Sequence, residues 1–312
     1  MQTLAVVVPI YNEQENLPEL YRRLRATFDL LPDVQATVIY VNDGSRDGSL
    51  PLMLEQHKTD PRFTVVELSR NFGHQPAITA GLAAAQGADA VVMMDGDLQD
   101  PPELIPELVA CWRSGADVVR AVRRERQETG LRRLGFDLFY RLMDWISDFP
   151  IPNQVGIFGL LGHQAVTELN RLPEKNRFLP GLRAWIGFDQ RTVFYDRQER
   201  AAGAPKQNLW RLFRYAMDGF LSFSYKPLRL MVGAGVLVSL VGFVLALSFI
   251  VRRLLGTETA QTGFTTLVTL VLFLGGLQLM ALGLLGEYLG RIYDEVKQRP
   301  LYIVKRHFKN DE

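Results

Sequence analysis

The sequence has very little cysteine and almost no net charge. Its 312 residues include one cysteine, Cys111, so an intramolecular disulfide and Cys-x-x-Cys metal sites are excluded. That scarcity fits a reducing compartment. The formal net charge is +1 at pH 7, so no overall positive field points to nucleic acid as a partner. The first residues enter an apolar run directly, without the basic segment and cleavage site of a signal peptide, and none is expected.

Several common active-site motifs are also missing. No Gly-x-Gly-x-x-Gly follows the first apolar run, which counts against a dinucleotide site, and no Gly-x-x-x-x-Gly-Lys-[Ser/Thr] is present, which counts against a P-loop. The serine-containing segment at residues 42–49 lacks a partner base, so hydrolase triad chemistry has no support.

Short apolar segments alternate with segments of helical spacing in the first third of the chain. Strands are predicted at residues 4–10, 36–41, 63–68 and 90–94, and helices at residues 17–31, 50–57 and 77–85. This alternation predicts an α/β fold with a mostly parallel sheet. Ligands of such sheets bind outside the carboxyl ends of the strands.

Each of the four predicted strands ends in a polar cluster. The clusters are Tyr11-Asn12-Glu13, Asn42-Asp43-Gly44-Ser45, Arg70-Asn71 and Asp95-Gly96-Asp97. Any one of them could be an ordinary loop, but four on one edge of a sheet indicate a ligand site.

The cluster after the fourth strand carries closely spaced oxygen ligands. Asp95, Asp97 and Gln99 follow a buried apolar run, and Gly96 allows the tight turn that would bring their side chains together. Such oxygens suit Mg2+ or Mn2+, which keep coordination places for phosphate. The alternative is a polar turn that caps the next helix.

Two basic segments come later in the chain. The first contains Arg120, Arg123, Arg124, Arg126, Arg132 and Arg133, and the second contains Arg197, Arg200 and Lys206 around a turn-prone stretch at residues 202–205. Several of these side chains are expected to lie on a solvated face. The functional interpretation is that the segments are anion-binding loops.

The C-terminal third has the character of a membrane anchor. Residues 209–223 have an apolar and a polar face, which indicates an interfacial helix, with a core helix as the alternative. Residues 230–250 and 264–286 contain no charged residue, and each run can cross a hydrocarbon core of about 30 Å. The flanking segments are more basic than the connector, so the positive-inside rule predicts both termini and the α/β domain in the cytoplasm.

Taken together, these motifs resemble family 2 glycosyltransferases with a GT-A (Rossmann-like) fold. Within them the chain is similar to polyprenyl-phosphate glycosyltransferases of the GtrB type, and more distantly to dolichol-phosphate mannose synthase. The resemblance covers essentially the whole chain and rests on residues 8–13, 41–49, 70–73 and 95–102. It implies a catalytic domain at residues 1–206, an interfacial helix at 207–228, two transmembrane helices at 229–290 and a cytoplasmic tail at 291–312.

The resemblance also implies roles for individual residues. Asp95, Asp97 and Gln99 would hold a divalent cation (Mg2+ or Mn2+), and the catalytic set would be Asp95, Asp97, Arg200 and Lys206. The nucleotide sugar would be bound by Pro9, Tyr11, Glu13 and Asp43. The acceptor phosphate would be bound by Arg123, Arg126, Arg200 and Lys206. Many relatives carry an acidic residue near position 154, where this chain has Gln154.

The implied reaction is inverting transfer of a hexose, best matched by glucose from UDP-glucose, to undecaprenyl phosphate at the cytoplasmic face of the inner membrane. GDP-mannose or another UDP-sugar is an alternative donor, and a non-catalytic, membrane-tethered nucleotide-sugar-binding protein is an alternative function. A processive polysaccharide synthase would need a Gln-x-x-Arg-Trp motif, which is absent. Glycines in the apolar runs permit close packing within one hairpin or between protomers.

Overall fold

The computed structural model describes residues 1–124, 156–175, 177–195, 226–255 and 263–309. Its centre is an eight-stranded sheet with the strand order β7-β5-β6-β4-β1-β2-β3-β8. The strands are β1 (Gln2–Ile10), β2 (Val34–Asn42), β3 (Phe63–Leu68), β4 (Ala90–Met93), β5 (Val118–Arg123), β6 (Gly159–Gly162), β7 (Gln190–Tyr195) and β8 (Val304–Phe308).

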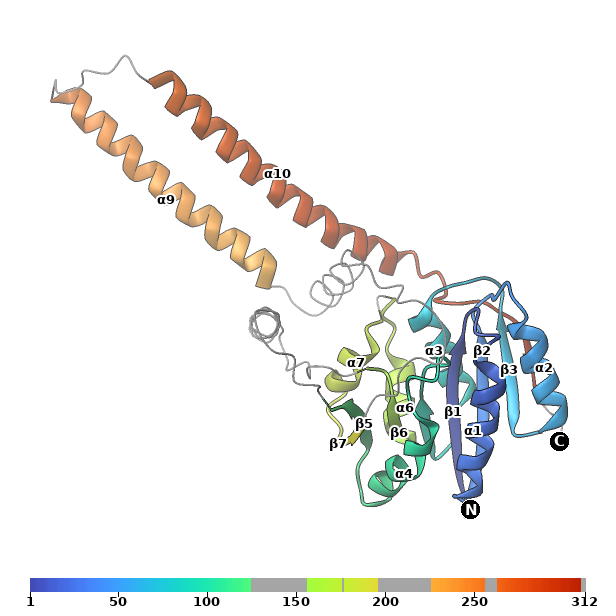
Figure 1. The fold of residues 1–312 in the computed structure, drawn as a ribbon. Helices are drawn as coiled ribbons and strands as arrows, with labels where there is room; N and C mark the ends of the chain where they lie inside the picture. Colours follow the sequence, from blue (N-terminus) through green and yellow to red (C-terminus); the bar gives the residue numbers. More distant parts are fainter. Residues whose placement is uncertain (125–155, 176, 196–225, 256–262, 310–312) are drawn as a thin grey trace.

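Helices cover both faces of this sheet (Figure 1). They are α1 (Leu17–Asp29), α2 (Ser49–Thr59), α3 (His74–Ala84), the short 3-10 helix η1 (Pro102–Leu104), α4 (Ile105–Arg113), α6 (His163–Arg171) and α7 (Leu179–Trp185). Alternate residues of β1 enter different cores: Val6 and Val8 pack on the side of α1 and α4, whereas Val7 packs on the side of α3. Burial on both faces explains why the strands are continuous apolar runs.

The strands that carry the polar clusters are parallel. β1 pairs in parallel with β2 and β4, and β2 pairs in parallel with β3. In this register Ile10 lies beside Asn42, and Val7 lies beside Met93. The segments that follow these four strands therefore lie at one edge of the sheet, which confirms the α/β fold and the mostly parallel sheet predicted from the sequence.

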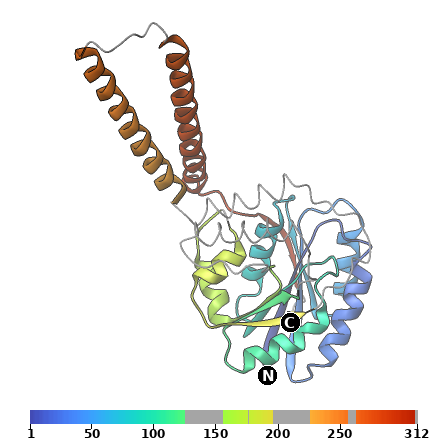
Figure 2. The same ribbon diagram turned by 60° about the vertical axis from the view of Figure 1, so that its left-hand side comes forward.

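Two long helices, α9 (Lys226–Leu254) and α10 (Gly263–Val296), project away from the sheet domain (Figure 2). Within α10 the stretch Phe273–Val296 is long and apolar enough to cross a membrane, and none of it is buried in the protein. In α9 the described residues contain a shorter apolar stretch, Met231–Leu245. Both helices overlap the predicted apolar spans.

The C-terminal end of the chain forms a strand that the sequence analysis did not predict. α10 continues without a break through the expected boundary at residue 290 and ends at Val296, and β8 then pairs antiparallel with β3. Lys305 of β8 also donates a 2.6 Å hydrogen bond to the buried carboxylate of Glu67. Part of the segment expected to be a tail is thus an edge strand of the central sheet.

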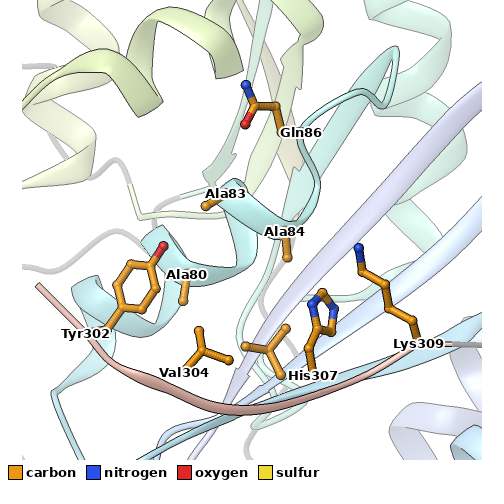
Figure 3. A pocket seen from close by; sticks show the side chains of 9 residues that line it. Ala80, Ala83, Ala84, Gln86, Tyr302, Val304, His307 and Lys309 are labelled. Carbon is orange, nitrogen blue, oxygen red and sulfur yellow. The ribbon is translucent and has the colours of Figure 1, made fainter. Parts of the chain in front are cut away.

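A cavity of about 410 Å3 lies between β8 and α3. Figure 3 shows Ala80, Ala83 and Ala84 of α3 beside the cavity, with Tyr302, Val304 and His307 on its other side. The residues that line it include none of the predicted site residues.

Candidate active site

The β4 turn (residues 95–100) follows β4 directly and is tightly folded. A Cβ at position 96 would lie 2.5 Å from Cδ1 of Ile10, so a larger residue there would require the end of the Ile10 side chain to shift. Leu98 has a φ of 63°, and the backbone N–H of Gln99 donates to Oδ1 of Asp97 at 3.2 Å. Gly96 lies close to Ile10 of β1, and Leu98 has a left-handed backbone conformation. Together these features reverse the chain at the edge of the sheet where the parallel strands β1 to β4 end, which we call the ligand edge.

The carboxylate of Asp95 faces the ring of His74. His74 is the first residue of α3, and its Nε2 lies 2.8 Å from Oδ1 of Asp95. Burial opposes a charge on His74, but the hydrogen bond to Asp95 and the nearby carboxylates outweigh it and raise its pKa. The sequence analysis did not select His74, although it ends the polar segment that follows β3.

Asp43 is buried and supports a neighbouring loop. It is 3% exposed, and its two oxygens accept hydrogen bonds from the backbone N–H groups of Phe72 at 2.7 Å and Gly73 at 3.0 Å. Burial raises the pKa of Asp43 in spite of these bonds. The carboxylate predicted to help bind the nucleotide sugar thus also holds the backbone of the segment that leads into His74.

The other predicted nucleotide-binding residues lie after or within β1. Pro9 is a buried strand residue, Tyr11 is 43% exposed, and the backbone N–H of Glu13 donates to Oγ of Ser49 at 3.0 Å. The segments after β1 and β2 are therefore connected, and Tyr11 is the member of this group that is most accessible to a ligand.

A third carboxylate of the β4 turn, Asp100, belongs to a buried cluster. Asp100 is 2% exposed, accepts a 2.9 Å hydrogen bond from the Tyr195 hydroxyl, and lies 3.6 Å from Nη2 of Arg123. The backbone N–H of Asp95 donates to its other oxygen at 3.2 Å. Burial, followed by the charge of Asp95, raises the pKa of Asp100 to about 6.

The Asp100 cluster joins the β4 turn to the ends of two further strands. Arg123 ends β5 and Tyr195 ends β7, and Nε of Arg123 donates to the Tyr195 hydroxyl at 3.0 Å. Burial, followed by the charge of Asp100, raises the pKa of Tyr195 to about 12. Arg123 was predicted to bind the acceptor phosphate, and the structure brings it to the β4 turn through Asp100. Sequence spacing gave no signal for this cluster, since its members are far apart in the chain.

Asp95 and Asp97 are the side chains best suited to hold a metal ion. Asp95 is 36% exposed at its side chain and Asp97 is partly exposed, whereas Gln99 is only 5% exposed. Two carboxylates that leave coordination places for phosphate oxygens suit Mg2+ or Mn2+. Within the described residues no group of three or more His, Cys, Asp or Glu side chains is arranged to hold a metal.

Three predicted site residues lie outside the described part of the chain. Arg126, Arg200 and Lys206 fall in the segments 125–155 and 196–225, as do Gln154 and the predicted interfacial helix up to residue 225. The described ends of β5 and β7 lead directly into these two segments, so the Asp100 cluster lies at the base of both.

Comparisons with known proteins identify two matching families. The model for glycosyl transferase family 2 matches residues 5–165, and the model for the GtrB C-terminal hairpin matches residues 226–292. The hairpin match spans most of α9 and α10.

Curated relatives match along almost the full chain. An uncharacterized glycosyltransferase, YkcC of Bacillus subtilis, is 45% identical, and the match covers 97% of this chain and 94% of the YkcC chain. The bactoprenol glucosyl transferase of Shigella phage SfII is 40% identical over 99% of both chains. A prophage bactoprenol glucosyl transferase homolog of Escherichia coli is 39% identical over 97% of this chain and 98% of its own.

Solved structures match less closely. A mannosyltransferase from Pyrobaculum calidifontis, in complex with GDP-Man and Mn2+, is 17% identical with a TM-score of 0.48 and covers 93% of this chain and 87% of its own. At this level of similarity the match does not bear on substrate or metal.

Proposed function

Because the chain belongs to glycosyl transferase family 2 and is a glycosyltransferase, we propose that it transfers glucose from a nucleotide sugar to a polyprenyl phosphate held in a membrane. The observation that carries this proposal is the pair of partly exposed carboxylates, Asp95 and Asp97, at the ligand edge of the sheet. The bactoprenol glucosyl transferases that match over the whole chain support glucose and a polyprenyl acceptor.

On the donor side, Asp95 and Asp97 would hold a divalent cation, and the exposed side chain of Tyr11 would help to bind the nucleotide. The cation would supply positive charge to the departing diphosphate. Asp43 contributes by fixing Phe72 and Gly73, and through them His74, whose ring orients the Asp95 carboxylate. UDP-glucose is the donor we propose.

On the acceptor side, a phosphate nucleophile removes the need for a dedicated base. The second pKa of a phosphomonoester is about 6, so its oxygen is already ionised at neutral pH. The enzyme must instead hold this anion near the donor diphosphate, which is the role we assign to Arg123, Arg126, Arg200 and Lys206. Many relatives carry an acidic residue near position 154, and Gln154 in this chain is compatible with a reaction that needs no base. Direct displacement would invert the anomeric carbon.

The membrane location follows from α9 and α10. We propose that both helices cross the bilayer and that the sheet domain and both termini face the cytoplasm, since the basic residues flank the hairpin on that side. The acceptor phosphate would then lie at the membrane surface below the sheet domain.

Transfer in membranes tests this function. Full-length protein in vesicles containing undecaprenyl phosphate is given radiolabelled UDP-glucose and Mg2+ or Mn2+, and the organic phase is analysed for glucosyl lipid. Formation of β-linked glucosyl phosphate from the α-linked donor is the expected result. Metal-dependent binding of UDP-glucose without transfer would contradict the proposal, and stronger labelling from GDP-mannose would change the sugar.

A further inference from the structure

The end of α10 nearest the sheet domain is held by a residue from the segment between α6 and α7. The side chain of Lys175 donates to the backbone carbonyl oxygens of Asp294 at 2.7 Å and Glu295 at 3.3 Å. The backbone N–H of Lys175 donates to Oε1 of Glu295 at 2.8 Å. Three hydrogen bonds thus join one residue of the catalytic domain to the last turn of a helix that leads out of it (Figure 1).

The charges in the last turn of α10 make a lysine beside this helix end favourable. The last carbonyl groups of a helix have no partners within it and carry partial negative charge, so cations are favourable at this end. The last turn of α10 has no basic residue and instead contains Asp294 and Glu295. Lys297, directly after the helix, lies 3.7 Å from Asp294. Lys175 adds a second positive charge, and this one belongs to the catalytic domain.

A second contact fixes the chain that leaves α10. The backbone N–H of Ser69, directly after β3, donates to the carbonyl oxygen of Ile303 at 2.9 Å, and β8 then pairs with β3. Ser69 lies at the same edge of the sheet as the β4 turn, because β3 is parallel to β2 and β2 to β1. The sheet domain therefore contacts the chain at two places: Lys175 contacts the last turn of α10, and Ser69 at the ligand edge contacts Ile303, which follows α10.

The segment that carries Lys175 also reaches the active site. The backbone N–H of Leu179, the first residue of α7, donates to Oε1 of Gln75 at 3.3 Å. Gln75 follows His74, whose ring contacts Asp95. Only a few residues thus separate the contact with α10 from the residue that orients a predicted metal ligand.

We propose that Lys175 and Glu295 form a clamp that fixes the ligand edge of the sheet relative to the membrane helices. Lys175 is then a positioning residue for an acceptor whose phosphate lies at the bilayer surface. This inference rests on the proposed function. A lipid phosphate in the bilayer cannot follow a catalytic domain that tilts or rises, whereas a water-soluble phosphate can diffuse to the site in any orientation of the domain. Loss of the clamp should therefore reduce transfer to the lipid phosphate and leave transfer to the water-soluble phosphate unchanged.

The test compares two acceptors in the same full-length protein in vesicles. One is undecaprenyl phosphate within the bilayer, and the other is a water-soluble prenyl phosphate of ten carbons. For Lys175→Ala we expect about a tenfold loss of transfer to undecaprenyl phosphate, the size expected for lost hydrogen bonds from a charged group. Transfer to the short acceptor and the KM for UDP-glucose should change by less than about twofold.

Matched variants make the result specific. Lys297→Ala removes a cation from the same helix end without touching the catalytic domain, and it should leave transfer to both acceptors unchanged. Lys175→Arg keeps a donor for the two carbonyl groups and should restore most of the lost transfer. Glu295→Ala removes the acceptor of the backbone bond and should show the same acceptor-dependent loss in a smaller degree.

The outcomes separate this inference from the proposed function. Two results for the Lys175→Ala and Glu295→Ala proteins would overturn the clamp: an equal loss of transfer to both acceptors, or no loss of transfer to either. In both cases transfer by the wild-type protein would still uphold the proposed function. Failure of the wild-type protein to glucosylate either acceptor would overturn the proposed function, and the clamp with it.

Discussion

The two ends of the β4 turn hold the same kind of side chain in opposite surroundings. Asp95 and Asp97 are partly exposed at the edge of the sheet, whereas Asp100 is almost fully buried against Arg123 and Tyr195. The difference follows from what lies beside each end. The ends of β5 and β7 cover Asp100 and leave Asp95 and Asp97 open, so the first two carboxylates can bind a ligand and the third can hold the strands.

Replacing an exposed carboxylate should have the largest effect on transfer. In Asp97→Asn one anionic ligand of the proposed metal is lost while the fold keeps its buried contacts. We expect transfer to fall by more than about 100-fold, since even outer-shell partners of a metal cost 10–100-fold. Initial rates with UDP-glucose measure the loss, and an unchanged thermal unfolding midpoint is the control. A variant that retains more than a tenth of the activity would remove Asp97 from the metal site.

Replacing a partner of the buried carboxylate should instead affect stability first. Tyr195→Phe removes the hydroxyl that bridges Asp100 and Arg123, and it leaves a buried acceptor and a donor without that partner. We expect a loss of about 1–3 kcal/mol in the free energy of unfolding. Denaturant unfolding measures it, and Phe194→Leu, at an exposed position of the same strand, is the control. Unchanged stability would mean that the cluster does not hold the strands together.

The smallest effect should be a pH dependence that comes from Asp100. Its pKa rises from 3.8 to about 6 on folding, so the folded protein keeps a proton that the unfolded chain has already released. This contribution to stability is present below pH 3.8 and is lost as the pH rises through about 6.

Unfolding of the wild type and of Asp100→Asn, both in EDTA, checks this sign. From about pH 4 to about pH 7 the free energy of unfolding of the wild type should fall relative to the variant by about 1–3 kcal/mol. A difference between wild type and Asp100→Asn that stays constant with pH would show that Asp100 does not take up a proton on folding.

The sequence was informative wherever the relevant partners are close in the chain or follow a simple period. The apolar runs gave β1 to β4, and parallel pairing then required their polar ends to meet, so Asp43, Asp95 and Asp97 were found together. Contacts across long sequence distances gave no comparable signal. Asp100 and Tyr195 are separated by 95 residues, and their pairing depends on how β5 and β7 join the sheet.

β8 was missed for a similar reason. It is a five-residue strand that contains two lysine or arginine side chains and a histidine, and nothing in its own pattern separates it from a charged tail. Only its partner β3, which lies more than two hundred residues earlier, makes it a strand. His74 was not predicted as a site residue because its role depends on a contact between its ring and Asp95. No rule of residue spacing predicts that contact.

Pairing between β3 and β8 has a consequence for biosynthesis. β3 is synthesised before both long helices, and β8 is synthesised after them. Until β8 is made, β3 is a sheet edge with unpaired backbone groups, which other chains could extend. Completion of the sheet therefore requires that α9 and α10 are synthesised first, and we expect a chain truncated before residue 304 to display an open edge. We therefore expect closure of the β3 edge to depend on synthesis of α9 and α10, which precede β8 in the chain.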